Sequence, residues 1–169
     1  MINRNLILII IIALTALTRF LPHPPNMTPI IAISMVSVAF FKSRHLQFGI
    51  PLLLMVLTDA IIGFHSLVPV VYLAILLAGC SGYLLRRQFS FVNILGSGLL
   101  GSIVFFVITN VGVWVMSDMY AYTLAGFIQC FVMAIPFFHN TLIATLGVLL
   151  GIYGMNYCWS FCDRKCTVK

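Results

Sequence analysis

Three charged or titratable side chains interrupt the apolar stretches of this sequence: Arg19, Asp59 and His65. An arginine can hold a carboxylate, a phosphate or amide oxygens through two parallel hydrogen bonds. Asp59 ends an apolar segment, where an ionisable residue is costly and tends to mark a site, an ion pair or a relay. Arg19 is therefore a ligand contact, a partner of Asp59 or a headgroup contact, and Asp59 is its partner, a ligand contact or both. His65 titrates near neutral pH and is a candidate ligand contact, although most loop histidines are structural.

Polar and aromatic residues in two further segments could complete a binding site. Asn26 closes a loop that contains three prolines, which exclude a helix and stiffen the backbone. The segment 109–122 carries amide, carboxylate and aromatic side chains, which can anchor helix ends at a membrane interface or bind a polar cyclic molecule. With Tyr72, the predicted substrate-binding residues are Arg19, Asn26, Asp59, His65, Tyr72, Asn110, Trp114, Asp118 and Tyr120.

Cys80 lies within an apolar segment, where it is either a small buried hydrophobe or a soft ligand for a transition metal. The surrounding Gly79-Cys-Ser-Gly82 also matches the Gly-x-Ser-Gly pattern of the rhomboid intramembrane proteases, with His139 as the candidate base. A nucleophile and its base must lie within hydrogen-bonding distance. The membrane threading described below separates Ser81 from His139 by more than half a bilayer, so a hydrolase is the weaker alternative and no catalytic residue is predicted.

The composition predicts a membrane protein. Of the 169 residues, 62% are hydrophobic and 7% are charged, whereas about a quarter of a soluble domain is charged. The net charge of +6 comes from short loops without an extended basic cluster, so nucleic-acid binding is excluded. The five cysteines lie in apolar segments or near the basic tail and are expected to be free thiols.

The apolar stretches and the basic residues together predict a topology. Eight of the nine Lys and Arg residues fall on one side of a six-span threading, which marks that side as cytoplasmic. Both termini would then be cytoplasmic, and the candidate site would face outward. The segment 119–138 is interpreted as a re-entrant or outward-side helix. The fold class is all-α polytopic, one membrane domain over residues 1–169, with six transmembrane helices at about 5–20, 29–41, 47–62, 68–85, 91–111 and 141–158.

Several motifs resemble a family of small bacterial membrane transporters related to the substrate-binding S components of energy-coupling-factor (ECF) vitamin transporters. They include Arg19-x3-His-Pro-Pro-Asn26, Pro51-x7-Asp59-x3-Gly63, Thr109-Asn-x-Gly-x-Trp114 and Ala134-Ile-Pro-Phe-Phe-x-Asn-Thr141. The resemblance implies an S-component-like fold in the bacterial inner membrane, surrounded by lipid, with an outward-side pocket for a small-molecule substrate.

Within this group the solitary cobalamin transporters, which work without a dedicated energising module, are the best functional match. The resemblance then implies cobalamin as the bound substrate and no intrinsic cofactor. Cys80 would be the ligand of the corrinoid cobalt, with His65 as the alternative, and a thiolate on cobalt could exchange an axial group. The other substrates to consider are a different vitamin and a nucleobase precursor.

Overall fold

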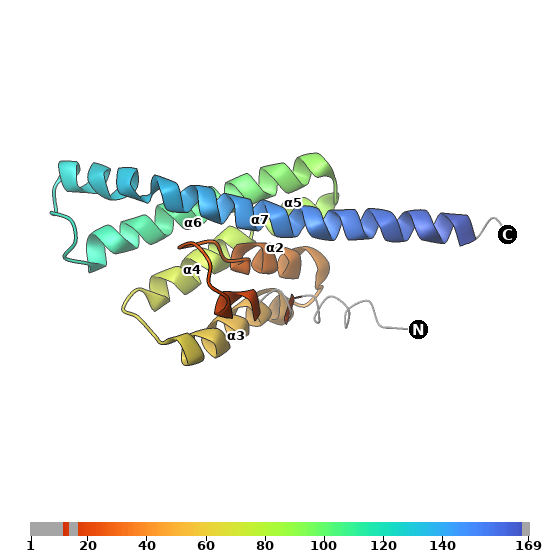
Figure 1. Ribbon diagram of the computed structural model, residues 1–169, viewed down its shortest axis with the longest axis horizontal. Coiled ribbons are helices and arrows are strands. Elements are labelled where there is room, and N and C mark those ends of the chain that lie inside the picture. Colours follow the sequence, from red (N-terminus) through yellow and green to blue (C-terminus); the bar gives the residue numbers. More distant parts are fainter. Residues whose placement is uncertain (1–11, 14–16, 167–169) are drawn as a thin grey trace.

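The structure is a computed structural model, in which residues 12–13 and 17–166 are described, with side chains as far as Asn156. The described residues form helices joined by loops, with no strand among them, as the all-α prediction requires (Figure 1). Its elements are η1 (Thr18–Phe20), α2 (Ile30–Phe40), α3 (Arg44–Ile62), α4 (Val68–Gly79), α5 (Gly82–Arg87), α6 (Phe91–Met116) and α7 (Leu124–Cys166).

Four helical segments are long and apolar enough to cross a membrane: Arg44–Ile62, Val68–Arg87, Phe91–Met116 and Leu124–Asn156. They include four of the six predicted spans: the ends of the first three differ by a few residues, whereas Leu124–Asn156 begins well before the predicted 141–158. The predicted span at 29–41 becomes the 11-residue helix α2, which is too short for this purpose. Most of the predicted first span, 5–20, lies outside the described residues.

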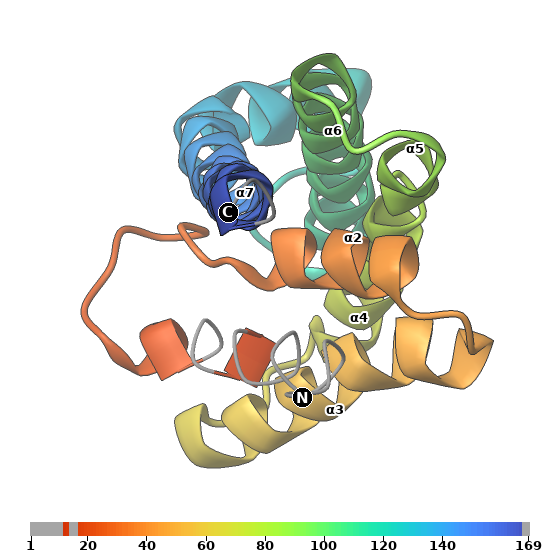
Figure 2. The same ribbon diagram turned by 90° about the vertical axis from the view of Figure 1, so that its right-hand side faces the viewer.

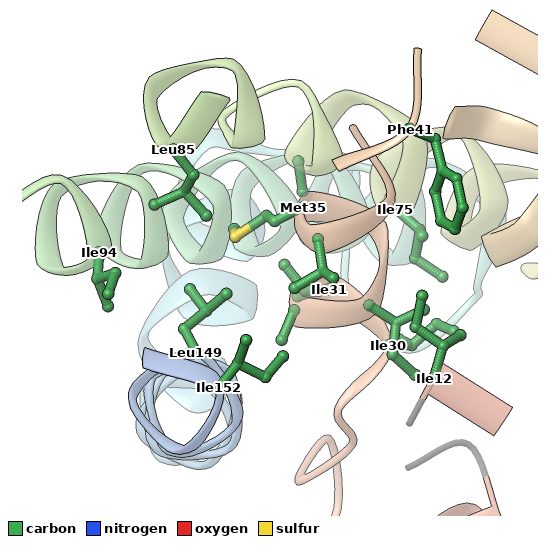
Figure 3. Close-up of a cluster of buried hydrophobic side chains, with 14 of the residues drawn as sticks. Ile12, Ile30, Ile31, Met35, Phe41, Ile75, Leu85, Ile94, Leu149 and Ile152 are labelled. Carbon is green, nitrogen blue, oxygen red and sulfur yellow. The ribbon is translucent and has the colours of Figure 1, made fainter. Parts of the chain in front are cut away.

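The short helix α2 forms the centre of the bundle. Every residue from Ile30 to Val38 is buried, and Figure 2 shows α2 between α3 on one side and α6 and α7 on the other. Ile31 and Met35 of α2 meet Leu149 of α7 and Leu85 of α5 in the hydrophobic core (Figure 3). A helix that is apolar on all faces needs burial on all faces, so α2 is the element on which the longer helices pack.

The predicted break between 119–138 and 141–158 is absent. One helix, α7, continues from Leu124 to Cys166 through Pro136, and at 1.5 Å per residue it is about 64 Å long. A proline removes one backbone hydrogen bond, but membrane helices tolerate it because neighbouring groups satisfy the freed carbonyl. The predicted separation of 119–138 from the last span was therefore wrong, and residues 124–138 form the first part of α7.

The predicted helix 68–85 is interrupted at Cys80 and Ser81. Cys80 N–H bonds to Leu77 O at 3.2 Å and Ser81 N–H to Ala78 O at 3.1 Å, so the helix tightens locally to a three-residue repeat. The interruption lies where α2 comes closest: a β-carbon on Gly82 would be 2.3 Å from the carbonyl oxygen of Met35.

Glycines on the last two long helices differ in their surroundings. A β-carbon on Gly98 of α6 would meet Leu146 of α7 at 2.5 Å, as expected for a packed helix face. Gly147 and Gly151 of α7, whose four-residue spacing predicted a buried face, are exposed, with nothing within 4 Å of an added β-carbon.

The basic residues of the loops lie at one of the two ends of the bundle. The α3–α4 and α6–α7 connections lie at one end, and the α2–α3 and α5–α6 connections at the other (Figure 1). Lys42, Arg44, Arg86 and Arg87 belong to the second end, towards which α7 also runs. The two loops that carry His65 and Tyr120 are thus both at the end away from these basic residues.

Candidate ligand-binding cavity

A cavity of about 410 Å³ lies between the central and outer helices at the end that carries His65 and Tyr120. Five of the predicted site residues line it: Arg19, Asn26, His65, Asn110 and Tyr120. The other five, Asp59, Tyr72, Cys80, Trp114 and Asp118, are not among the described residues that form its wall. A volume of about 300–1,000 Å³ is usual for small-molecule sites, so the cavity has the size to hold such a ligand.

Arg19, Asp59 and Tyr72 form one polar network at the cavity wall. Arg19 Nη2 donates to Asp59 Oδ1 at 2.9 Å, and the Tyr72 hydroxyl donates to Asp59 Oδ2 at 2.9 Å. Nη1 of Arg19 is held by the hydroxyl of Thr58 and by the sulfur of Met55. The Asp59 side chain is 5% exposed and that of Arg19 is 14% exposed. Arg19 is thus the cavity residue of this network, and Asp59 and Tyr72 lie behind it as its support.

Helix α6 contributes a polar edge through Thr109 and Asn110. The Thr109 hydroxyl donates to Phe105 O at 2.8 Å, and Asn110 Nδ2 donates to Phe106 O at 2.7 Å. The hydroxyl proton of Thr109 and one of the two amide protons of Asn110 are therefore used in hydrogen bonds to the helix backbone. The hydroxyl lone pairs of Thr109 and the amide oxygen of Asn110 are left to accept hydrogen bonds.

The contribution of α7 was missed by the sequence analysis. Cys130, Met133, Ala134 and Phe137 line the cavity, and their spacing of three, one and three residues places them on one helical face. Interpreting 119–138 as a separate outward segment removed this face from consideration. The three- and four-residue spacing of these side chains within 119–138 is the signal that would have found it.

Trp114 and Tyr122 stabilise the α6–α7 connection. Trp114 Nε1 donates to Ala121 O at 3.1 Å, and the Tyr122 hydroxyl donates to Val115 O at 2.8 Å. The two rings also contact each other edge to face, with centroids 5.8 Å apart. The same loop carries Met119 and Tyr120 into the cavity wall, so Trp114 acts on the site by fixing this loop.

At the α4–α5 junction, the Cys80 thiol and the Ser81 hydroxyl each contact a backbone carbonyl of the preceding helical turn. Cys80 Sγ lies 3.4 Å from Leu76 O of its own helix. The buried Ser81 hydroxyl donates to Ala78 O at 2.8 Å and lies against Gly101 of α6. His139 is exposed on α7 with its ring beside Phe138. The described structure therefore does not bring Ser81 and His139 together as a nucleophile and a base.

The loop between η1 and α2, residues 21–29, is attached to the bundle at both sides. Arg19 ties its beginning to α3, as described above. Near its end, Asn140 Nδ2 donates to Pro25 O at 3.0 Å and the Thr141 hydroxyl lies 3.3 Å from Asn26 O. Asn26 has a φ of 61°, in the left-handed region that asparagine tolerates better than most residues. We call residues 21–29 the strap; it carries Asn26 and Thr28 into the cavity wall.

A metal site built by the protein alone is not evident in the part of the chain described. No group of three or more His, Cys, Asp or Glu side chains comes together there. Within the cavity, His65 and Cys130 are the side chains that metals most often use.

Comparison with known proteins identifies the family to which the sequence belongs. No curated protein and no solved structure matches the chain. A family of unknown function, DUF6580, matches residues 1–162, nearly the full length of the sequence. The chain belongs to this family.

Proposed function

We propose that this protein is a bacterial inner-membrane transporter, or the substrate-binding component of one, for a vitamin-sized polar molecule. The single observation that carries the proposal is the cavity at the end of the bundle opposite the basic loops. Because basic loops accumulate on the cytoplasmic side, a cavity at the other end would load from outside. The four long apolar helices support a membrane location.

The proposal includes a six-span, S-component-like arrangement with both termini cytoplasmic, in which α2 is a short crossing covered by protein on all sides. It is supported by the sorting of Lys42, Arg44, Arg86 and Arg87 to one end. It also includes action without a dedicated energising module, which rests on the resemblance given above.

Filling the cavity tests this function. Ala134 lines the cavity and is buried, whereas Ala125 of the same helix is exposed and is not part of the wall. Ala134→Phe should remove a small molecule that co-purifies with the protein, as measured by mass spectrometry of extracts from purified protein in nanodiscs. Ala125→Phe should retain it. Equal loss in both variants, or equal retention in both, would contradict a function for this cavity.

Cobalamin is the second candidate, and the presence of His65 in the cavity wall favours it, since an imidazole can bind cobalt. The volume favours a smaller molecule: about 410 Å³ suits a drug-sized ligand, and a corrinoid with its ring amides and nucleotide loop is considerably larger. A smaller vitamin or a nucleobase precursor is therefore the leading substrate class.

An absorbance spectrum with added cyanocobalamin separates the two candidates. If a corrinoid binds, His65→Ala should shift its spectrum, because His65 lines the cavity, whereas Cys80→Ala should not, because Cys80 contacts its own helix. A spectrum that changes only in Cys80→Ala would restore the thiolate ligand predicted from the resemblance. Absence of any corrinoid spectrum would leave the smaller substrates.

A further inference from the structure

The cavity wall contains one permanent charge among the residues described, that of Arg19. This charge is already compensated by Asp59, whose two oxygens accept from Arg19 and from Tyr72 at 2.9 Å each. An anionic ligand at Arg19 would therefore have to compete with a carboxylate that is 5% exposed and cannot reach water when displaced. Burying a second, uncompensated negative charge beside Asp59 would be strongly unfavourable.

The polar edge on α6 points to the same ligand class by an independent argument. Thr109 gives its one hydroxyl proton, and Asn110 one of its two amide protons, to the backbone of their own helix, so both can accept hydrogen bonds and Asn110 keeps one N–H. The Thr109 oxygen attracts N–H and O–H donors and repels a carboxylate, which has no proton to give, and Asn110 pairs best with a group that, like an amide, both donates and accepts. A ligand that satisfies this edge carries hydrogen-bond donors.

We infer that the substrate of this cavity is an electrically neutral molecule with N–H donors of the amide type, and that Asp59 determines this selectivity by neutralising Arg19. The donors would bind Thr109 and Asn110 of α6. The body of the ligand would lie among the apolar wall residues, which include Val71, Ile75, Phe105 and Phe137. The inference rests on the proposed function, because it assigns the substrate class of the same cavity.

Matched amides and acids test the charge argument directly. Nicotinamide and nicotinate, and benzamide and benzoate, differ mainly in the group that carries the charge. Their binding to protein in nanodiscs can be compared by saturation-transfer NMR at pH 8. The wild-type protein should bind each amide at least about tenfold more tightly than its acid. N,N-dimethylnicotinamide, which lacks the N–H donors, should bind as poorly as the acid.

Variants of the ion pair then test the role of Asp59. Asp59→Asn leaves Arg19 uncompensated and should reverse the preference towards nicotinate and benzoate. Tyr72→Phe removes one hydrogen bond without changing the charge and should keep the amide preference. If Asp59→Asn folds poorly, the double variant Arg19→Gln/Asp59→Asn removes both charges and should also keep it.

The outcomes distinguish this inference from the proposed function. A wild-type protein that binds the acids as tightly as the amides, in a manner blocked by Ala134→Phe, would overturn the neutral substrate class and leave the cavity as a binding site. Binding of none of these probes by wild type and all variants would overturn both.

Discussion

Gly82→Ala is expected to destabilise the protein by about 3 kcal/mol, at the upper end of the usual cost of overpacking. The new β-carbon would lie 2.3 Å from the carbonyl oxygen of Met35 and 2.9 Å from its Cα. These are backbone atoms of α2, which is buried on all sides and packs against five other helices. Since α2 cannot move away without disturbing those contacts, α5 would have to separate from it. The loss should appear as a lower midpoint in SDS-induced unfolding of the purified protein.

Gly147→Ala is the matched control for this variant. It makes the same chemical change inside a helix, but nothing lies within 4 Å of the added β-carbon. Because alanine favours a helix over glycine by up to about 1 kcal/mol, Gly147→Ala should leave the midpoint unchanged or raise it. Similar losses in both variants would show that the cost does not arise from the α2–α5 contact.

Arg19→Met is expected to cost about 3–5 kcal/mol, the range found when one partner of a buried ion pair is removed. The change leaves the Asp59 carboxylate, 5% exposed, with the Tyr72 hydroxyl as its remaining partner in the described network. It also removes the side chain that joins the beginning of the strap to Thr58 and Met55 of α3. The same SDS titration measures the loss, and the binding of nicotinamide should weaken with it.

Removing both charges should recover much of this loss. In Arg19→Gln/Asp59→Asn no uncompensated charge remains, and the two amides can still bond to each other and to Tyr72. A double-mutant cycle with the two single variants gives the coupling energy of the pair. Additive effects would contradict a direct interaction between Arg19 and Asp59 in the folded protein.

The helical membrane class and four of the long segments were accessible from the sequence because both depend on apolar runs of sufficient length. The pairing of Arg19 with Asp59 was also among the alternatives, because a charge in an apolar segment requires a partner. The role of α2 was less accessible. The stretch 29–41 was predicted as a short membrane span. Only the packing of α2 against its neighbours reveals that it is surrounded by protein on all sides.

The assignments that differ from the structure were those that depended on helix continuity or on the direction of one side chain. The segment 119–138 was taken as separate from the span at 141–158, although α7 continues through both. Cys80 and Trp114 have the chemistry of ligand-binding residues, but Cys80 contacts the backbone of its own helix and Trp114 that of the α6–α7 loop. Residue type identifies what a side chain can bind, whereas its direction depends on the rotation of the helix, which tertiary packing decides.

The two attachments of the strap differ in strength, and this difference sets the order in which they would release. On the α3 side, a charge-assisted bond and two further contacts hold Arg19, and such bonds are about twice as strong as neutral ones. On the α7 side, Asn140 and Thr141 offer neutral bonds to Pro25 and Asn26, and Thr141 also lies 3.0 Å from Phe137 O, which competes for its proton. The strap would therefore detach first from α7, at Asn140 and Thr141, while Arg19 still holds its other end to α3.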